Sequence, residues 1–405
     1  MSFVSSFGSI KRNCLLLGLA SLVGMGLINT ALAKTPGQVR AQCQREGRPC
    51  VGLVLSGGGA RGFAHVGVIK VLEEMHIKVD VVTGTSMGAM VGGAYAAGYT
   101  GAQLEETVNG VDWKRMFASR ADRSDLPWRQ KMDDYSNLSS GSIRLTHKGE
   151  IVLPDSLVPS QELTLFLEKE TGVVNHINDL SNLAIPFTAV ATDLVNGDRV
   201  ELQKGLNLAA AMRASMSVPG VFAPVMQGNR LLVDGGLVDN LPVELARKMG
   251  ADVIIAVNVG TPLLKRDELN SVVAVMGQMV NLLTEKSVNR SIEALRQNDI
   301  LITPSLEAFD SADMERGAEI IEAGRVAAEG VKELLAKLSS KEHDWQSWEA
   351  KRETAVLPDS RVTEHRVSEV RVEGLTYINP ETVLSELAFD TSRPITNEQI
   401  DEAAR

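Results

Sequence analysis

The fold is decided by residues 51–62, VGLVLSGGGARG, and residues 79–88, VDVVTGTSMG. Each stretch begins with a short apolar run and continues into a glycine-containing turn, and a helical pattern of apolar residues follows. Two successive strand–turn–helix units of this kind are typical of an α/β fold with a parallel sheet. We therefore predict strands over 51–55 and 79–82, each followed by a helix.

The same alternation continues to residue 338 and predicts one three-layer, doubly wound domain over 51–338, with a mostly parallel sheet. Further strands are expected at Phe187–Ala191, Arg230–Val233, Val253–Val259 and Ile300–Thr303. Further helices are expected at Leu206–Ala214, Leu241–Met249, Ser271–Arg296 and Ala312–Leu338.

Composition excludes several classes of protein. Of the 405 residues, 44% are hydrophobic and 23% are charged, which argues against a disordered chain, a fibrous repeat and a polytopic membrane protein. The net charge of −10 argues against a nucleic-acid partner, which needs a cationic surface. It also argues against anchoring to anionic lipid by charge alone.

The N-terminus has the pattern of a secretory signal. Lys11 and Arg12 precede an uncharged run that ends in Ala31-Leu32-Ala33. We predict a cleaved signal peptide over 1–33 and export of the chain, although the uncharged run is also long enough for an uncleaved anchor. Residues 34–50 are expected to form a polar leader, in which Cys43 and Cys50 either form a disulfide, the favoured interpretation, or remain free thiols.

Three other segments depart from the α/β pattern. Residues 112–158 form a long insertion with tryptophans beside basic residues, which is either a lipid-contacting loop or a solvated loop with buried tryptophans. Residues 339–365 are charged, lack periodicity and are interpreted as a linker. Residues 366–405 predict one strand and two helices, too few to close a core, so we expect a truncated domain.

The stretch Gly84-Thr85-Ser86-Met87-Gly88 is a G-x-S-x-G at a strand-to-helix junction. A serine at this place sits on a sharp turn with its hydroxyl exposed, and small neighbours are needed because backbone crowds the turn. Ser86 is therefore the candidate nucleophile. The rest of the nucleophile elbow comprises Gly84, Thr85, Met87 and Gly88.

The first glycine turn offers a nest of backbone N–H groups that can bind a phosphate or an oxyanion. A dinucleotide-binding fold would place an acid at the end of the next strand, but Asp80 precedes that strand's apolar residues and Ser86 follows them. We therefore favour an oxyanion hole. Its candidate residues are Gly57, Gly58, Gly59, Ala60, Arg61 and Gly62.

A serine hydroxyl needs a base, and the six histidines are poorly placed because none follows an expected strand. Asp234 follows an apolar run and precedes two glycines, so a strand end would present it. A partly desolvated carboxylate can accept the serine proton directly. The alternative is a turn acid that bonds its own backbone. Asp193 is the second candidate, whereas Asp239 and Asp252 are expected to cap helices or turns.

Three blocks in this order, Ser56–Gly62, Gly84–Gly88 and Asp234-Gly235-Gly236, resemble the patatin-like phospholipases. Arg213-Ala214-Ser215, Val218–Phe222 and Asp234–Val243 resemble the bacterial branch. The resemblance covers residues 51–338 and implies a serine lipid acyl hydrolase without cofactor or metal. It implies that Ser86 is the nucleophile, Asp234 the base, and the amides around Gly57, Gly58 and Gly59 the oxyanion hole.

Residues 366–405 resemble the start of a POTRA domain, notably at 370–375 and 381–384. With the signal peptide and the patatin-like region, this arrangement resembles the type V autotransporters of Gram-negative bacteria. It implies a phospholipid substrate at a membrane interface and, in a longer form, contact with an outer-membrane barrel. A homodimer is left open. The alternative functions are a non-catalytic secretion or binding module of this fold and, less favoured, a dinucleotide-binding oxidoreductase.

Overall fold

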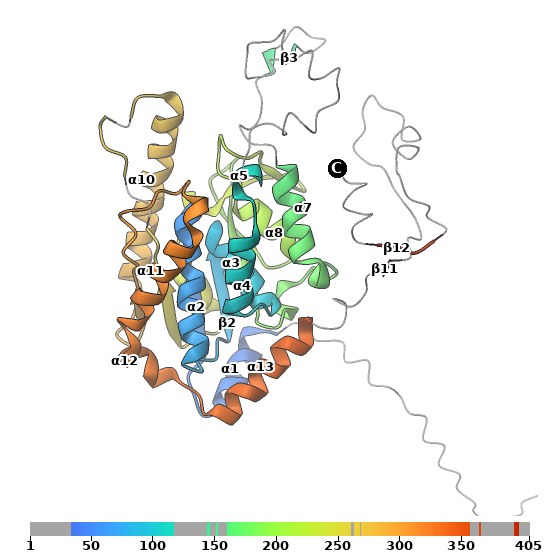
Figure 1. Ribbon diagram of the computed structural model, residues 1–405, viewed down its shortest axis with the longest axis vertical. Coiled ribbons are helices and arrows are strands. Elements are labelled where there is room, and N and C mark those ends of the chain that lie inside the picture. Colours follow the sequence, from blue (N-terminus) through green and yellow to red (C-terminus); the bar gives the residue numbers. More distant parts are fainter. Residues whose placement is uncertain are drawn as a thin grey trace, which may run out of the picture. The chain divides into compact units, whose positions relative to one another are not determined.

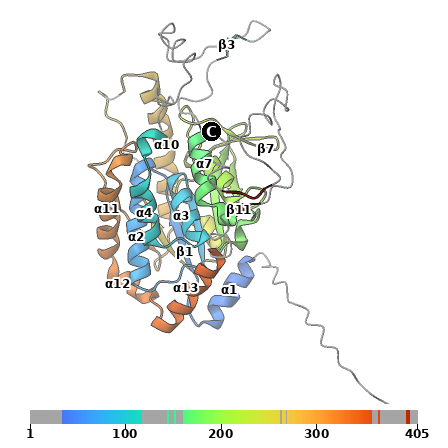
Figure 2. The ribbon, with the colours of Figure 1, turned by 45° about the vertical axis from the view of Figure 1, so that its right-hand side comes forward.

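The computed structural model describes residues 34–116, 144–145, 151–152, 160–260, 263–267, 269–356, 364–365 and 393–396. A central sheet lies between helices (Figures 1 and 2). Its strands are β1 (Val51–Leu55), β2 (Val81–Thr85), β5 (Phe187–Asp193), β6 (Arg199–Leu202), β7 (Val225–Gln227), β8 (Arg230–Asp234), β9 (Val253–Val257) and β10 (Ile300–Ile302). The order is β10-β9-β1-β2-β5-β8-β7, with β6 also paired to β5.

The helices are α1 (Pro36–Arg45), α2 (Ala64–Glu74), α3 (Met87–Ala97), α4 (Gly101–Gly110), α5 (Trp113–Met116), α7 (Gln161–Glu170), α8 (Leu208–Ser215), α9 (Val243–Lys248), α10 (Val272–Glu293), α11 (Gly317–Glu329), α12 (Lys332–Leu335) and α13 (Glu342–Val356). Short 3-10 turns include η1 (Gly59–Phe63), η4 (Gly235–Leu237) and η5 (Met314–Arg316). Two small antiparallel pairs join β3 (Arg144–Leu145) to β4 (Ile151–Val152) and β11 (Glu364–His365) to β12 (Ile395–Thr396).

The predicted mostly parallel α/β sheet is confirmed. Strands β10, β9, β1, β2 and β5 are mutually parallel, whereas β6, β7 and β8 add antiparallel pairs around β5. All five residues of β1 are buried. Leu53 and Leu55 face the apolar core that includes α2, α3 and α8, while Val54 faces the core that includes α9. Burial on both faces explains why the central strands appear as continuous apolar runs.

Several predicted boundaries differ from the structure. Strand β2 begins at Val81 and continues through Gly84 and Thr85, because pairing with β1 and β5 extends along these residues. The predicted helix 312–338 is divided into η5, α11 and α12, and α11 ends at Glu329 before Gly330. Strands β6 and β7 were not predicted, because β6 shows no all-buried apolar run and β7 is only half-buried or exposed.

The predictions of a polar leader outside the fold and of an irregular linker are wrong. Residues 36–45 form α1, which buries Val39 and Cys43, and a Cys43–Cys50 disulfide joins it to the start of β1. In the region expected as a linker, α13 buries Trp345 and Arg352. The Arg352 guanidinium lies 4.2 Å from the Tyr95 ring centroid. Each helix attaches through few buried side chains, so neither shows a clear apolar period.

Several predictions fall outside the described residues. They concern the signal peptide over 1–33, most of the insertion 112–158, and the strand and helices expected within 366–405. Among the residues that are described, no helix combines the length and apolarity needed to span a bilayer.

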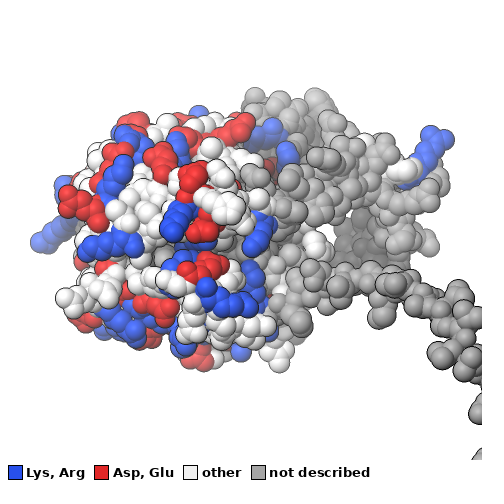
Figure 3. Space-filling model, turned by 90° about the horizontal axis from the view of Figure 1, so that it is seen from below, with Lys and Arg blue, Asp and Glu red and all other residues white. Residues whose placement is uncertain are grey.

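Carboxylates cap the amino ends of the central parallel strands. Asp80 accepts the Val51 N–H at 2.8 Å and pairs with Arg48, while Asp299 accepts the Ile254 N–H at 2.8 Å. On the face of the molecule seen from below, acidic and basic side chains lie side by side (Figure 3). The net negative charge of the chain therefore does not form a single-sign field on this face.

Helices α2 and α11 pack along each other through two glycines (Figure 1). A Cβ on Gly67 would lie 1.9 Å from the carbonyl oxygen of Ile321, and a Cβ on Gly324 would lie 1.9 Å from that of Ala64. The helix pair therefore depends on the absence of side chains at both positions.

Gly67→Ala is expected to lower the free energy of unfolding by about 2–3 kcal/mol, because α2 and α11 must separate to accept the methyl group. The measurement is a urea unfolding curve. Gly277→Ala in α10 is the control: a Cβ there meets no described atom within 4 Å. Its free energy of unfolding should rise by about 0.5–1 kcal/mol, as is ordinary for a glycine-to-alanine change in a helix. Equal stability of Gly67→Ala and the parent would contradict the packing described.

Candidate active site

Ser86 stands on a strained turn between β2 and α3. Its backbone has φ +54° and ψ −123°, a conformation rare for a residue with a side chain. A Cβ on Gly84 would lie 2.3 Å from the Gly88 carbonyl oxygen, and a Cβ on Gly88 would lie 2.3 Å from that of Leu55. Both glycines are thus required by close backbone contact, as predicted for a nucleophile elbow.

The register of the sheet brings Ser86 next to Asp234. Val190 of β5 pairs with Thr85 at the end of β2, and the next residue, Ala191, pairs with Asp234 at the end of β8. Since β2 is parallel and β8 antiparallel to β5, the carboxyl ends of β2 and β8 meet. Ser86, one residue beyond β2, therefore lies beside Asp234.

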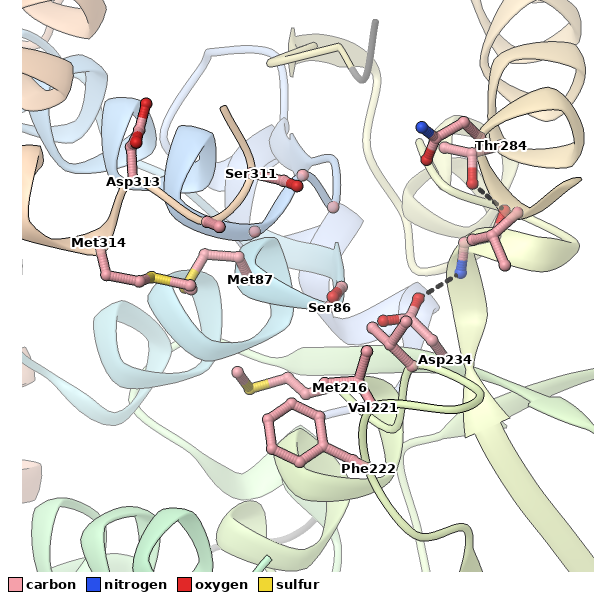
Figure 4. A pocket seen from close by; sticks show the side chains of 18 of the residues that line it. Ser86, Met87, Met216, Val221, Phe222, Asp234, Thr284, Ser311, Asp313 and Met314 are labelled. Carbon is pink, nitrogen blue, oxygen red and sulfur yellow. Dashed lines mark hydrogen bonds between the residues drawn. The ribbon is translucent and has the colours of Figure 1, made fainter. Parts of the chain in front are cut away.

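The Asp234 carboxylate is buried and only half satisfied. Its Oδ1 accepts the Gly236 N–H at 2.7 Å, whereas Oδ2 has no hydrogen-bond partner among the described residues. The Ser86 hydroxyl faces this carboxylate across the cavity (Figure 4). Burial raises the pKa of Asp234 to about 6, while the Ser86 hydroxyl and the Gly236 N–H oppose that rise by favouring the charged form.

Only part of the predicted oxyanion hole has free donors. Gly57 donates its N–H to Asn240 Oδ1 at 3.1 Å, and Ala60 donates to the Ser311 carbonyl at 2.8 Å. Within the described part of the chain, the N–H groups of Gly58 and Gly59 make no hydrogen bond. Met87 is the first residue of α3, and its N–H adds a third donor at a helix N-terminus.

The remaining residues of the glycine loop hold it in place. The Arg61 guanidinium is buried and donates to the carbonyls of Val259, Leu306 and Phe309 at 2.8–3.1 Å. A Cβ on Gly62 would lie 2.4 Å from the Met87 side chain, so this glycine lets α3 approach η1. Arg61 and Gly62 are therefore structural supports of the loop.

Two supporting residues were missed by sequence reasoning. Ser215 at the end of α8 accepts the Ser86 N–H at 2.9 Å and donates to the Val190 carbonyl at 2.6 Å. Asn240 also donates Nδ2 to the Gly57 carbonyl at 3.3 Å, which ties the Asp234 turn to the glycine loop. Both lie within the stretches that resemble bacterial relatives, and that was the available signal.

The other candidates are not brought to the site. Among the described residues, no histidine lines the cavity beside Ser86. His65 is buried in α2, its Nε2 lies 2.8 Å from the Ser56 carbonyl, and burial lowers its pKa to about 4. Asp193 accepts the Val195 N–H in a local turn. Asp239 pairs with Arg199.

The group of described residues that could hold a metal consists of Cys43, Cys50 and Asp80. Both sulfurs are joined in the disulfide, so neither is available as a thiolate ligand. The two turns and the carboxylate thus describe a site built from a hydroxyl, a carboxylate and backbone donors.

Ser86 and Asp234 open into a cavity of about 730 Å³. Its wall is apolar over Met87, Trp113, Met216, Val218, Val221, Phe222, Val280 and Met314, several of which are drawn in Figure 4. Charged residues also line it: Lys114, Asp313, Glu315 and Arg316. The cavity therefore offers an apolar surface beside the hydroxyl–carboxylate pair and charged residues elsewhere on its lining.

Comparison with known proteins agrees with this geometry. Residues 53–247 match the family described as patatin-like phospholipase. An uncharacterized NTE family protein of Mycobacterium tuberculosis (strain H37Rv) is 36% identical over 211 residues, which are 52% of this chain and 49% of the relative. The lysophospholipase nte1 of Emericella nidulans is 36% identical over 213 residues, 52% of this chain and 12% of that protein.

A patatin-like phospholipase domain-containing protein of Caenorhabditis elegans is 30% identical over 312 residues, 70% of this chain and 21% of the relative. Among solved structures, VipD from Legionella pneumophila matches 71% of this chain and 67% of its own with a TM-score of 0.39 and 19% identity. The chain spans about half the length of the first curated relatives it matches, and less of the others. The family match covers just under half of this chain, and its residues 53–247 include the three blocks that the fold assembles around Ser86 and Asp234.

Proposed function

We propose that this protein is a serine lipid acyl hydrolase of the phospholipase A or lysophospholipase type, with Ser86 and Asp234 as a catalytic dyad. The observation that carries the proposal is the buried Asp234 carboxylate, whose Oδ2 accepts no hydrogen bond from the described residues and which faces the Ser86 hydroxyl. A carboxylate with a pKa of about 6 is ionised at neutral pH and basic enough to accept a proton.

The geometry supports a two-step acyl transfer. Ser86 Oγ attacks the ester carbonyl carbon, and its proton passes to Asp234 Oδ2. The N–H groups of Gly58, Gly59 and Met87 stabilise the oxyanion, which is usually the largest electrostatic contribution in this chemistry. Asp234 returns the proton to the leaving alcohol. Water, deprotonated by the same carboxylate, then attacks the acyl carbon, and Asp234 passes that proton to Ser86 Oγ as the fatty acid is released.

The apolar wall supports an acyl ester as substrate. Burial of a CH₂ group is worth about 0.8 kcal/mol, so a chain of methylenes along methionine, valine and phenylalanine side chains would supply much of the binding energy. Three relatives are named lysophospholipases, in Emericella nidulans, Mycosarcoma maydis and Kluyveromyces lactis. A glycerophospholipid, diacyl or lyso, fits the combination of apolar wall and charged lining.

We also propose that the chain is exported by a Gram-negative bacterium and that residues 366–405 begin a POTRA-like domain. The Cys43–Cys50 disulfide supports an oxidising compartment. In a longer form, the POTRA-like domain would contact an outer-membrane barrel.

N-terminal sequencing of the protein made in a Gram-negative host should find Lys34 first. A mature protein that begins at Met1 and stays in the cytoplasm would contradict export.

Ser86→Ala and Asp234→Asn are each expected to lower kcat/KM for phospholipid or p-nitrophenyl esters by about 10³-fold or more, because one removes the nucleophile and the other the base. Asp193→Asn is the matched control, since Asp193 is also buried at a strand end and should keep activity within about threefold. Full activity of Asp234→Asn would contradict the dyad.

The stability of Asp234→Asn separates loss of the base from loss of the fold. The folded-state pKa of Asp234 lies above its unfolded value, so ionisation from about pH 4 to pH 6 destabilises the parent. At pH 8 the variant should therefore melt at the same temperature as the parent or higher. A large fall in Tm at pH 8 would attribute lost activity to unfolding.

The pH profile of kcat/KM should have an acid limb with an apparent pKa near 6. Asp234 must be ionised to accept the serine proton, so activity falls as pH decreases through that value and is constant from about pH 7 to pH 8. The measurement is kcat/KM for a soluble short-chain ester from pH 4.5 to 8.5. An acid limb near 4 would contradict the raised pKa of Asp234, and activity that rises as pH falls would exclude Asp234 as the base.

A further inference from the structure

A second, smaller cavity lies behind the wall of the first. It is almost wholly apolar and has a free volume of about 40 Å³. Its lining comes from α2, α3, α4, α5, α7 and α8, and includes Val66, Met90, Val108, Phe166, Leu167 and Met212. In Figure 1, α5 lies over α3 and α4 and next to α7, above this part of the core.

Trp113 lines both cavities, and no other described residue does so. It is 4% exposed, and its indole Nε1 donates to the Val108 carbonyl at 2.8 Å. The ring centroid lies 5.0 Å from that of Phe63 and 5.9 Å from that of Phe166. These contacts hold the indole in one position between the two spaces.

We propose that Trp113 is the end wall of the acyl-chain site and sets the length of the chain that is cleaved. The inference rests on the proposed hydrolase function and adds a specificity residue to it. With the indole in place, the second cavity is too small for an extended chain. Replacing the indole by a methyl group joins it to the catalytic cavity as one apolar channel.

The chemistry of the lining favours an acyl chain over a head group in this direction. The second cavity has almost no polar surface, and a charged head group there would lose its hydration without compensation. The charges of the catalytic cavity lie on exposed or half-buried residues, such as Lys114, Glu315 and Arg316. A substrate would thus place its acyl chain, and not its head group, against Trp113.

The test compares kcat/KM for p-nitrophenyl esters from C4 to C16 between the parent and Trp113→Ala. For each variant, activity on C4 is the reference against which the longer esters are compared. The ratio of C16 to C4 activity should rise about tenfold or more, since several additional methylenes become buried at about 0.8 kcal/mol each. Trp113→Leu, which keeps apolar contact with Phe63 and Phe166, should shift the profile in the same direction but less.

A second substitution, in the lining of the second cavity, should fill the space that Trp113→Ala opens. Thr107 of α4 is half-buried and lines only the second cavity. Thr107→Phe alone should leave the chain-length profile unchanged, whereas Thr107→Phe combined with Trp113→Ala should cancel the gain on C16. This non-additivity is not expected if Trp113 acts only through stability.

The outcomes are distinguishable. An unchanged profile in folded, C4-active Trp113→Ala overturns the inference and leaves the hydrolase intact. Unfolding of both Trp113→Ala and Trp113→Leu, seen as loss of the thermal transition, assigns the indole to the core and also overturns it. Absence of hydrolysis of every ester by the parent contradicts the proposed function itself.

Discussion

The structure depends on a close backbone contact between the start of α3 and the end of β1. Gly88 has no side chain at the point where a Cβ would lie 2.3 Å from the Leu55 carbonyl oxygen. This approach places the Ser86 turn against the glycine loop that follows β1. A larger residue would separate Ser86 from the backbone donors of Gly58 and Gly59, and no rotation of side chains could restore that distance.

The position of the Asp234 carboxylate depends on a second constraint, the register with which β2 and β8 pair with β5. Strand β8 pairs antiparallel with the last residues of β5, and its final residue, Asp234, lies opposite Ala191, one residue beyond the partner of Thr85 at the end of β2. Burial at that point raises the pKa of Asp234. The desolvated carboxylate therefore lowers the stability of the folded protein at neutral pH. Such local destabilisation is typical of catalytic sites.

Local pattern was sufficient to predict β1, α2, α3, the Ser86 turn and the place of Asp234 at a strand end. The two interpretations of Asp234 are compatible, because Oδ1 makes the turn bond to Gly236 and Oδ2 remains for Ser86. The contacts of Asn240 with Gly57 and of Ser215 with Ser86 span 183 and 129 residues, and no local pattern encodes them. Helix α13 was missed because its attachment depends on few buried side chains, among them Trp345 and Arg352.

The central claim is that Ser86, activated by Asp234, is the nucleophile. The most direct measurement is tandem mass spectrometry of the protein after reaction with a fluorophosphonate at pH 8. The account predicts one adduct, on Ser86, formed rapidly in the parent and far more slowly in Asp234→Asn. An adduct on a different residue, or no adduct on Ser86 in protein that hydrolyses esters, would contradict it.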